Sequence, residues 1–135
     1  MYKNILVPIS FDEDCNADGA IAVAKALAED DAKITLIHVM EHIPAYAITY
    51  MPGEYLTESR KAIVQDLDRR AAAVPNGEGV VIEGHSGRSI VDYAEKNKVD
   101  CVVIASHRPG MQDYFLGSTA AQVVRHAPCA VHVLR

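Results

Sequence analysis

The residues best suited to chemistry in this chain are Gly117, Ser118 and Thr119, which stand at the start of a short helical pattern. A glycine lets backbone N–H groups approach a ligand closely, and the N–H groups and dipole at a helix start attract negative charge. Ser118 adds a hydroxyl donor at the same place. The tripeptide therefore predicts a site for a phosphate group. An equally common explanation is that Ser118 only caps the helix, and that explanation needs no ligand.

The rest of the sequence contains no pattern typical of a catalytic centre. The six histidines lack the spacing of a set of metal ligands. Neither a P-loop nor a GxSxG motif is present, and no nucleophile has an evident base partner. We therefore predict no catalytic residue, no metal-binding residue and no dedicated enzymatic activity.

Length and charge limit the remaining classes of function. The chain has 135 residues, which suits one domain over residues 1–135. Its 13 basic and 18 acidic residues give a formal charge of −5, which argues against a nucleic-acid binder. No apolar run is long enough to cross a membrane, and no secretory signal precedes the first apolar run. We therefore expect a cytoplasmic protein whose three cysteines are reduced.

Short apolar runs alternate with helical patterns along the whole chain. Strands are predicted at residues 5–9, 33–39, 80–82, 100–105 and 129–134. The first helical pattern covers residues 16–28, with Asp12 or Asp14 as its N-cap. The second opens near Thr57 and stops at residues 75–77, and the third follows a turn at residues 84–87. The last covers residues 118–126, with Ala121, Val123 and Val124 available for packing.

This alternation predicts an α/β fold, a parallel sheet with helices on both faces. Ligands of such sheets bind beyond the carboxyl ends of the strands, where the strand order reverses. The loops at that edge are residues 10–14, 40–54, 84–87 and 106–117. The predicted phosphate site therefore lies where the fold favours a ligand.

Four segments carry a resemblance to a known family. They are K-N-I-L-V-P-I at residues 3–9, L-I-H-V at residues 36–39, A-S-H-R-P at residues 105–109, and L-G-S-T-A-A-Q-V-V-R-H-A-P-C-A-V-H-V-L-R at residues 116–135. In these segments, and over nearly its whole length, the chain resembles the universal stress protein family. The resemblance implies a doubly wound, three-layer fold of the adenine nucleotide alpha hydrolase-like type, with five parallel strands in the order 3-2-1-4-5.

Nucleotide-binding members of that family carry the pattern G-x2-G-x9-G-S/T after the fourth strand. In this chain Ala105 takes the place of the first glycine and Arg108 that of the second, while Gly117 and Ser118 are retained. The span from Ala105 to Gly117 is also one residue shorter. The S-H-R-P form resembles a branch of small members that retain nucleotide. Arg108 can offer a guanidinium group to phosphate oxygens in place of backbone access at a glycine.

The resemblance implies an adenine nucleotide as ligand: ATP, or AMP or ADP, with or without Mg²⁺. It assigns the phosphates to the start of the last helix and to Arg108, and the nucleoside to the ends of the first, second and fourth strands. Ser10 stands where many members have an aspartate. The residues expected to bind are Pro8, Ile9, Ser10, Val39, Ala105, Ser106, His107, Arg108, Gly117, Ser118 and Thr119.

The last strand, from Cys129 to Leu134, is expected at an edge of the sheet, where unpaired backbone groups invite pairing. Family members commonly dimerise through this strand, so we expect a homodimer and an unidentified regulatory partner protein. The resemblance implies a dimeric stress-response module that binds nucleotide without efficient turnover. Two alternatives remain: a nucleotide-free dimeric interaction protein, in which Gly117 and Ser118 only start a helix, and a protein with slow ATP hydrolysis or self-phosphorylation.

Overall fold

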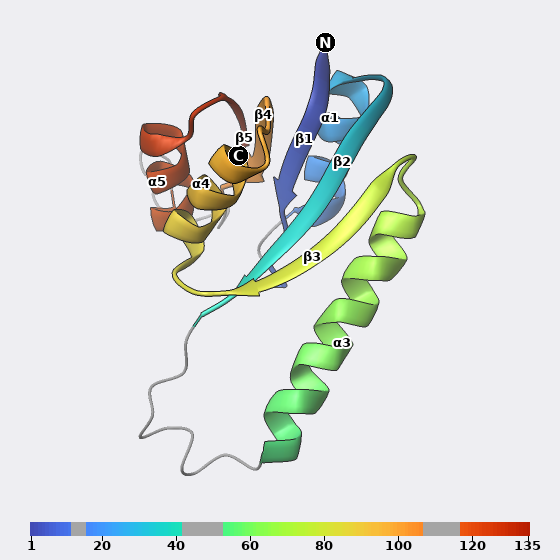
Figure 1. The fold of residues 1–135 in the computed structure, drawn as a ribbon, viewed down its shortest axis with the longest axis vertical. Coiled ribbons are helices and arrows are strands. Elements are labelled where there is room, and N and C mark those ends of the chain that lie inside the picture. The colour runs from blue at the N-terminus through green and yellow to red at the C-terminus, as the bar shows by residue number, and fades with distance from the viewer. Residues whose placement is uncertain (12–15, 42–52, 107–116) are drawn as a thin grey trace.

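The computed structural model describes residues 1–11, 16–41, 53–106 and 117–135, apart from the side chains of residues 54–56. Its centre is one five-stranded sheet in the order β3-β2-β1-β4-β5, in which all neighbouring strands are parallel. The strands are β1 (Tyr2–Pro8), β2 (Ala28–Met40), β3 (Gly77–Glu83), β4 (Cys101–Ala105) and β5 (Ala130–Leu134). The predicted fold class and strand order are therefore confirmed (Figure 1).

Helices cover both faces of this sheet. The helix α1 (Ala17–Leu27) and the C-terminal part of α3 (Gly53–Ala72) pack on one face, where Ile5, Val7 and Leu36 are buried. The helices α4 (Ser86–Lys96) and α5 (Ser118–His126) pack on the other face, over Leu6 and Ile37. Figure 1 shows α4 and α5 together on their side of the sheet, away from α3. Neighbouring residues of a strand thus enter different cores, because strand side chains alternate.

Three strands begin earlier than the sequence pattern predicts, and the first of them, β1, begins at Tyr2 and not at Ile5. The pattern places the start of β2 at Lys33, but the strand begins at Ala28, which pairs with Tyr2 across a shift in register. Asp31 lies in that irregular stretch with a positive φ of 67°. The third strand begins at Gly77, three residues before the expected Val80. The first residues of β2 are largely acidic, so a search for apolar runs does not detect the start of this strand.

The starts of the helices also correct several predictions. The N-cap of α1 is Asn16, whose side-chain oxygen accepts a hydrogen bond from the Gly19 N–H at 2.8 Å. Asp12 and Asp14 lie outside the described residues. The helix α3 begins at Gly53, four residues before the expected Thr57, so the end of the predicted 40–54 loop is helical. The helix α4 begins at Ser86, within the turn predicted for residues 84–87.

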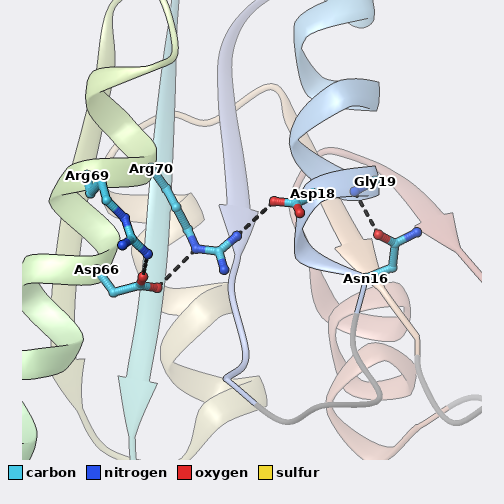
Figure 2. A network of polar contacts seen from close by, with 6 residues as sticks. All are labelled: Asn16, Asp18, Gly19, Asp66, Arg69 and Arg70. Carbon is cyan, nitrogen blue, oxygen red and sulfur yellow. Dashed lines mark hydrogen bonds and ion pairs between the residues drawn. The ribbon is translucent and has the colours of Figure 1, made fainter.

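An ion-pair network joins α3 to α1 on the outside of the first core. The Arg70 guanidinium group donates to Asp66 Oδ2 at 3.0 Å and to Asp18 Oδ1 at 2.9 Å. Arg69 pairs with the same Asp66 carboxylate, and Figure 2 shows the three side chains of α3 facing the start of α1. The hydrogen bond that Arg70 donates to the Asp66 carboxylate raises the pKa of Arg70. Asp18 is largely exposed, so its pair with Arg70 contributes little to stability.

The two central strands β1 and β4 are joined at their amino ends by Asp100. Its carboxylate accepts hydrogen bonds from the backbone N–H groups of Lys3 and Asn4, at 2.8 and 3.1 Å. The Asp100 N–H donates to the Asn4 carbonyl oxygen at 2.9 Å. The strands pair directly at only two positions, Ile5 with Cys101 and Leu6 with Val102. Asp100 therefore extends the contact between the two halves of the sheet.

Cys101 is a buried free thiol, and Cys129 is a half-buried one. Cys15 lies outside the described residues. None of the helices in the described part of the chain is long and apolar enough to cross a membrane.

Candidate functional site

The carboxyl end of β1 lies beside the point where the strand order reverses between β1 and β4. The backbone just after β1 is held to β2 at Ile9. Its N–H donates to the Ile37 carbonyl oxygen at 2.7 Å, and its carbonyl oxygen lies 2.8 Å from His38 Nδ1. Pro8 and Ser10 flank this fixed residue and are half-buried. Three of the expected nucleoside contacts therefore stand together at this edge.

A ring contact that the sequence pattern did not indicate lies next to these residues. Phe11 and His38 pack edge to face, with ring centroids 4.8 Å apart. Phe11 is 38% exposed. His38 and Val39 are neighbours in β2, so their side chains leave opposite faces of the sheet. Val39 packs against the core under α4 and α5, and it pairs with Ile82 of β3. The alternation of side chains along a strand is the sequence signal that places His38 and Val39 on opposite faces of the sheet.

The end of β4 is tied to the last strand and the last helix. Ala105 pairs with Leu134 of β5, and the Ser106 N–H donates to the Leu134 carbonyl oxygen at 2.8 Å. Ser106 Oγ accepts a hydrogen bond from the Gly117 N–H at 3.1 Å. The residues on either side of the 107–116 segment are thus in direct contact. The expected site residues His107 and Arg108 belong to that segment and lie outside the described residues.

The helix α5 starts without a side-chain cap. Gly117 is its N-cap, with φ −58° and ψ 153°, and no side chain caps the helix there. Ser118 is the first helical residue and is exposed, so the alternative in which Ser118 is the N-cap is wrong. The first turn has no acidic residue. Within the described ranges, the N–H groups of Ser118 and Thr119 have no hydrogen-bond partner. An anion fits such a helix start.

A chain of side chains that the sequence analysis missed runs from this helix start to the end of β2. Thr119 Oγ1 lies 2.9 Å from Ser86 Oγ, at the start of α4. Ser86 Oγ in turn donates to Glu41 Oε1 at 3.5 Å, a long contact. The helix α4 also lacks a side-chain cap and an acidic residue in its first turn. The starts of α4 and α5 and the end of β2 therefore meet at one place.

Close packing of α4 and α5 fixes the position of this helix start. Gly87 is buried, and a Cβ atom there would lie 2.3 Å from Gln122 Oε1. The helix α5 buries Ala120 and Val123. Val124, which the sequence analysis placed among the packing residues, is 44% exposed, because it lies on the outer side of the helix. In the described parts of the chain, no group of His, Cys, Asp and Glu side chains could hold a metal ion.

Comparisons with known proteins agree with this geometry. The model of the universal stress protein family matches residues 1–135. Universal stress protein G of Salmonella typhimurium is 30% identical over 142 residues, and the match covers 100% of both chains. The solved structure of universal stress protein UspA from Lactobacillus plantarum is 28% identical, with a TM-score of 0.72. That match covers 99% of this chain and 98% of the other.

Two more distant solved structures contain nucleotides. One is a universal stress protein in complex with cAMP, 23% identical, with a TM-score of 0.64 over 99% of this chain and 97% of the other. The second is a universal stress protein family protein from Arabidopsis thaliana with AMP bound. It is 18% identical, with a TM-score of 0.64 over 98% of this chain and 90% of the other. At these identities, the likeness shows a shared fold.

Proposed function

Because the chain belongs to the universal stress protein family, we propose that it binds ATP or a related adenine nucleotide without efficient turnover. The nucleotide lies at the carboxyl edge of the sheet, between the end of β1 and the start of α5. The phosphates contact the start of α5 and Arg108, and the nucleoside contacts the strand ends. The residues assigned to the site are Pro8, Ile9, Ser10, Val39, Ala105, Ser106, His107, Arg108, Gly117, Ser118 and Thr119.

The observation that carries this proposal is the uncapped start of α5 beside the reversal of strand order. Ser118 is exposed there, and the first turn has no acidic side chain to compete with a phosphate. Gly117 is held in place by Ser106, whose backbone in turn is bound to β5. A helix start that is fixed before the ligand arrives loses little freedom on binding. The geometry therefore favours a phosphate group at this position.

The adenine nucleotide class is supported by the relatives whose structures contain AMP and cAMP. Their shared base and sugar belong at the strand ends, and their phosphates at the helix start. Ser10 offers a hydroxyl group without charge, so it can bind a sugar hydroxyl without repelling the phosphates. The described side chains show no metal site of their own. Phosphate oxygens are themselves good ligands for Mg²⁺, so a nucleotide can bring the ion with it.

Nucleotide retention and calorimetry test this function directly. Protein purified under native conditions is denatured, and the supernatant is analysed for ATP, ADP, AMP and cAMP. The same nucleotides are titrated into the protein, with Mg²⁺ and with EDTA. We expect released adenine nucleotide or saturable binding at micromolar to millimolar concentration. Absence of both release and binding at millimolar nucleotide contradicts the proposal.

The double variant Gly117→Asp, Ser118→Ala locates the site. An aspartate at the N-cap satisfies the helix amides itself, so the helix remains stable while a phosphate is repelled. We expect at least a tenfold loss of nucleotide affinity. The control Gln65→Glu adds the same charge on the exposed side of α3, and it should bind like the wild type. Equal affinity of the double variant and the control would place the nucleotide elsewhere.

A nucleotide-free interaction protein is the second candidate function. Two observations favour it: Ala105 stands in the place of a family glycine and is paired with Leu134, and the Gly117 N–H already donates to Ser106 Oγ. In that function the double variant leaves dimer and partner binding unchanged, and the wild type binds no nucleotide. In both functions we propose a cytoplasmic homodimer, joined through β5, that acts in a stress response through a regulatory partner.

A further inference from the structure

Glu41 brings a carboxylate to the same part of the sheet edge as the start of α5. The residue directly follows β2, and the carbonyl oxygen of Met40 accepts a hydrogen bond from the Gly84 N–H at 3.0 Å. This bond holds the end of β2 beside the turn that leads into α4. Glu41 Oε1 therefore lies within 3.5 Å of Ser86 Oγ, which contacts Thr119 Oγ1 at 2.9 Å. Two hydroxyl groups link the carboxylate to the helix that we assign to the phosphates.

The charge of Glu41 has no partner of opposite sign in the described part of the chain. The nearby Glu83, at the end of β3, differs in this respect, because it pairs with Arg60 at 2.7 Å. Neither α4 nor α5 has an acidic residue in its first turn. Among the described residues, Glu41 is therefore a carboxylate that contacts the start of α4 directly, at Ser86, and reaches the start of α5 only through Ser86 and Thr119. Its side chain is exposed, so a cation that arrives with a ligand can reach it.

We propose that Glu41 selects among nucleotides by the charge of their phosphates. This inference rests on the proposed function. A carboxylate near bound phosphates repels each added negative charge. In the absence of divalent cations it therefore weakens the binding of ATP more than the binding of AMP. Carboxylate and phosphate oxygens are both good ligands for Mg²⁺. When Mg²⁺ is present, the same carboxylate therefore no longer weakens the binding of ATP. Glu41 makes binding of the triphosphate depend on the cation and leaves binding of the monophosphate independent of it.

The variant Glu41→Gln tests this role, because it removes the charge and keeps an oxygen that can accept from Ser86. Affinities for ATP and AMP are measured by calorimetry in EDTA and in excess Mg²⁺. In EDTA we expect ATP to bind about fivefold more tightly than to the wild type, with a change of less than about twofold for AMP. In Mg²⁺ the gain for ATP should disappear. The matched control Glu95→Gln removes an equal charge from the last turn of α4 and should leave the ratio of affinities unchanged.

Salt provides a second measurement. Screening weakens the repulsion between Glu41 and the phosphates, so the difference in ATP affinity between Glu41→Gln and the wild type in EDTA should shrink as salt is added. Equal changes for both nucleotides in Glu41→Gln, or the same shift in Glu95→Gln, would overturn the role of Glu41 while the nucleotide site stands. A wild type that binds neither nucleotide overturns the proposed function, and the role of Glu41 with it.

Discussion

At the scale of single residues, the burial of the Cys101 thiol makes the free energy of unfolding depend on pH. The residue is 1% exposed, and burial, with smaller effects from Cys129 and Asp100, raises its pKa from 9.0 to about 11. The unfolded chain therefore loses this proton at lower pH than the folded chain. The stabilising effect of the neutral thiol is complete below pH 9 and is lost as the pH rises towards 11.

The comparison with Cys101→Ala isolates this effect from other groups that titrate in the same range. Between about pH 8 and about pH 10.5, we expect the wild type to lose about 1–2 kcal/mol more of its free energy of unfolding than the variant. Urea denaturation at both pH values measures the difference. The lower starting stability of the variant, caused by its cavity, cancels in this comparison. Parallel pH dependences of the two proteins would show that Cys101 does not titrate in this range.

Residue types alone predicted some features of the site and missed others. The pattern after Gly117 placed Ser118 at a helix start, and α5 begins at that residue. The contacts of Glu41 with Ser86 and of Ser86 with Thr119 join three elements far apart in the sequence. No local pattern encodes such a contact, because it depends on the register of the strands and the crossing of the helices.

At the scale of elements, the contact between α4 and α5 depends on one glycine. A Cβ atom at Gly87 would lie 2.3 Å from Gln122 Oε1, 2.8 Å from its Cδ and 3.0 Å from its Cβ. We therefore expect Gly87→Ala to lower the free energy of unfolding by about 1–3 kcal/mol, although alanine favours a helix. It should also weaken nucleotide binding, because α5 carries Gln122 and its position relative to α4 changes. Urea denaturation and calorimetry measure the two effects.

A second substitution relieves the clash and serves as the test of its cause. In the double variant Gly87→Ala, Gln122→Ala the amide group is gone, so most of the lost stability should return. The control Gly53→Ala places a methyl group at the start of α3, where no atom lies within 4 Å, and should be close to neutral. If Gly87→Ala is as stable as Gly53→Ala, the two helices are not closely packed at this point.

The sequence patterns predicted the presence of the helices and strands better than the residues at which they begin. The apolar strands β1 and β4 were found because each contains a continuous run of buried apolar residues, and α5 was placed from Ser118 to His126 as observed. The starts of β2 and α3 were missed. Glu29, Asp30 and Asp31 are exposed within β2, and among the described side chains of α3 only Leu67 and Ala71 are buried. An element that buries few side chains leaves a weak period in the sequence.

At the scale of the whole molecule, the order of strands decides which segments can form the site. Alternating strands and helices predict a parallel sheet, and the common direction of its strands brings all their carboxyl ends to one edge. The identity of the central strands came from the family resemblance, because alternation alone allows several strand orders. Once β1 and β4 are neighbours, residues 8–10 and 105–106 come together from opposite ends of the sequence.

The free edge of the sheet at β5 leads to the prediction of a homodimer. This strand pairs with β4 on one side only, and it ends the sheet. Val131, Val133 and Leu134 are half-buried, while Ala130 and His132 are exposed. Pairing with the same strand of a second chain would satisfy the outer backbone groups and cover these side chains. We therefore expect a dimer at about 10 µM in size-exclusion chromatography with light scattering.

The variant His132→Asp should convert this dimer to a monomer, because the twofold axis brings the two added charges close together. The variant Gln65→Glu adds one charge on α3, remote from β5, and should remain dimeric. A wild type that is monomeric, or a His132→Asp protein that is still dimeric, contradicts pairing through this strand.

The Ser106 N–H donates to the Leu134 carbonyl oxygen, so the end of β5 contacts a residue of the proposed site. The nucleotide affinity of the monomeric variant therefore tests whether pairing at β5 affects the site. Nucleotide affinity that falls with dissociation would show that pairing at β5 supports the end of β4.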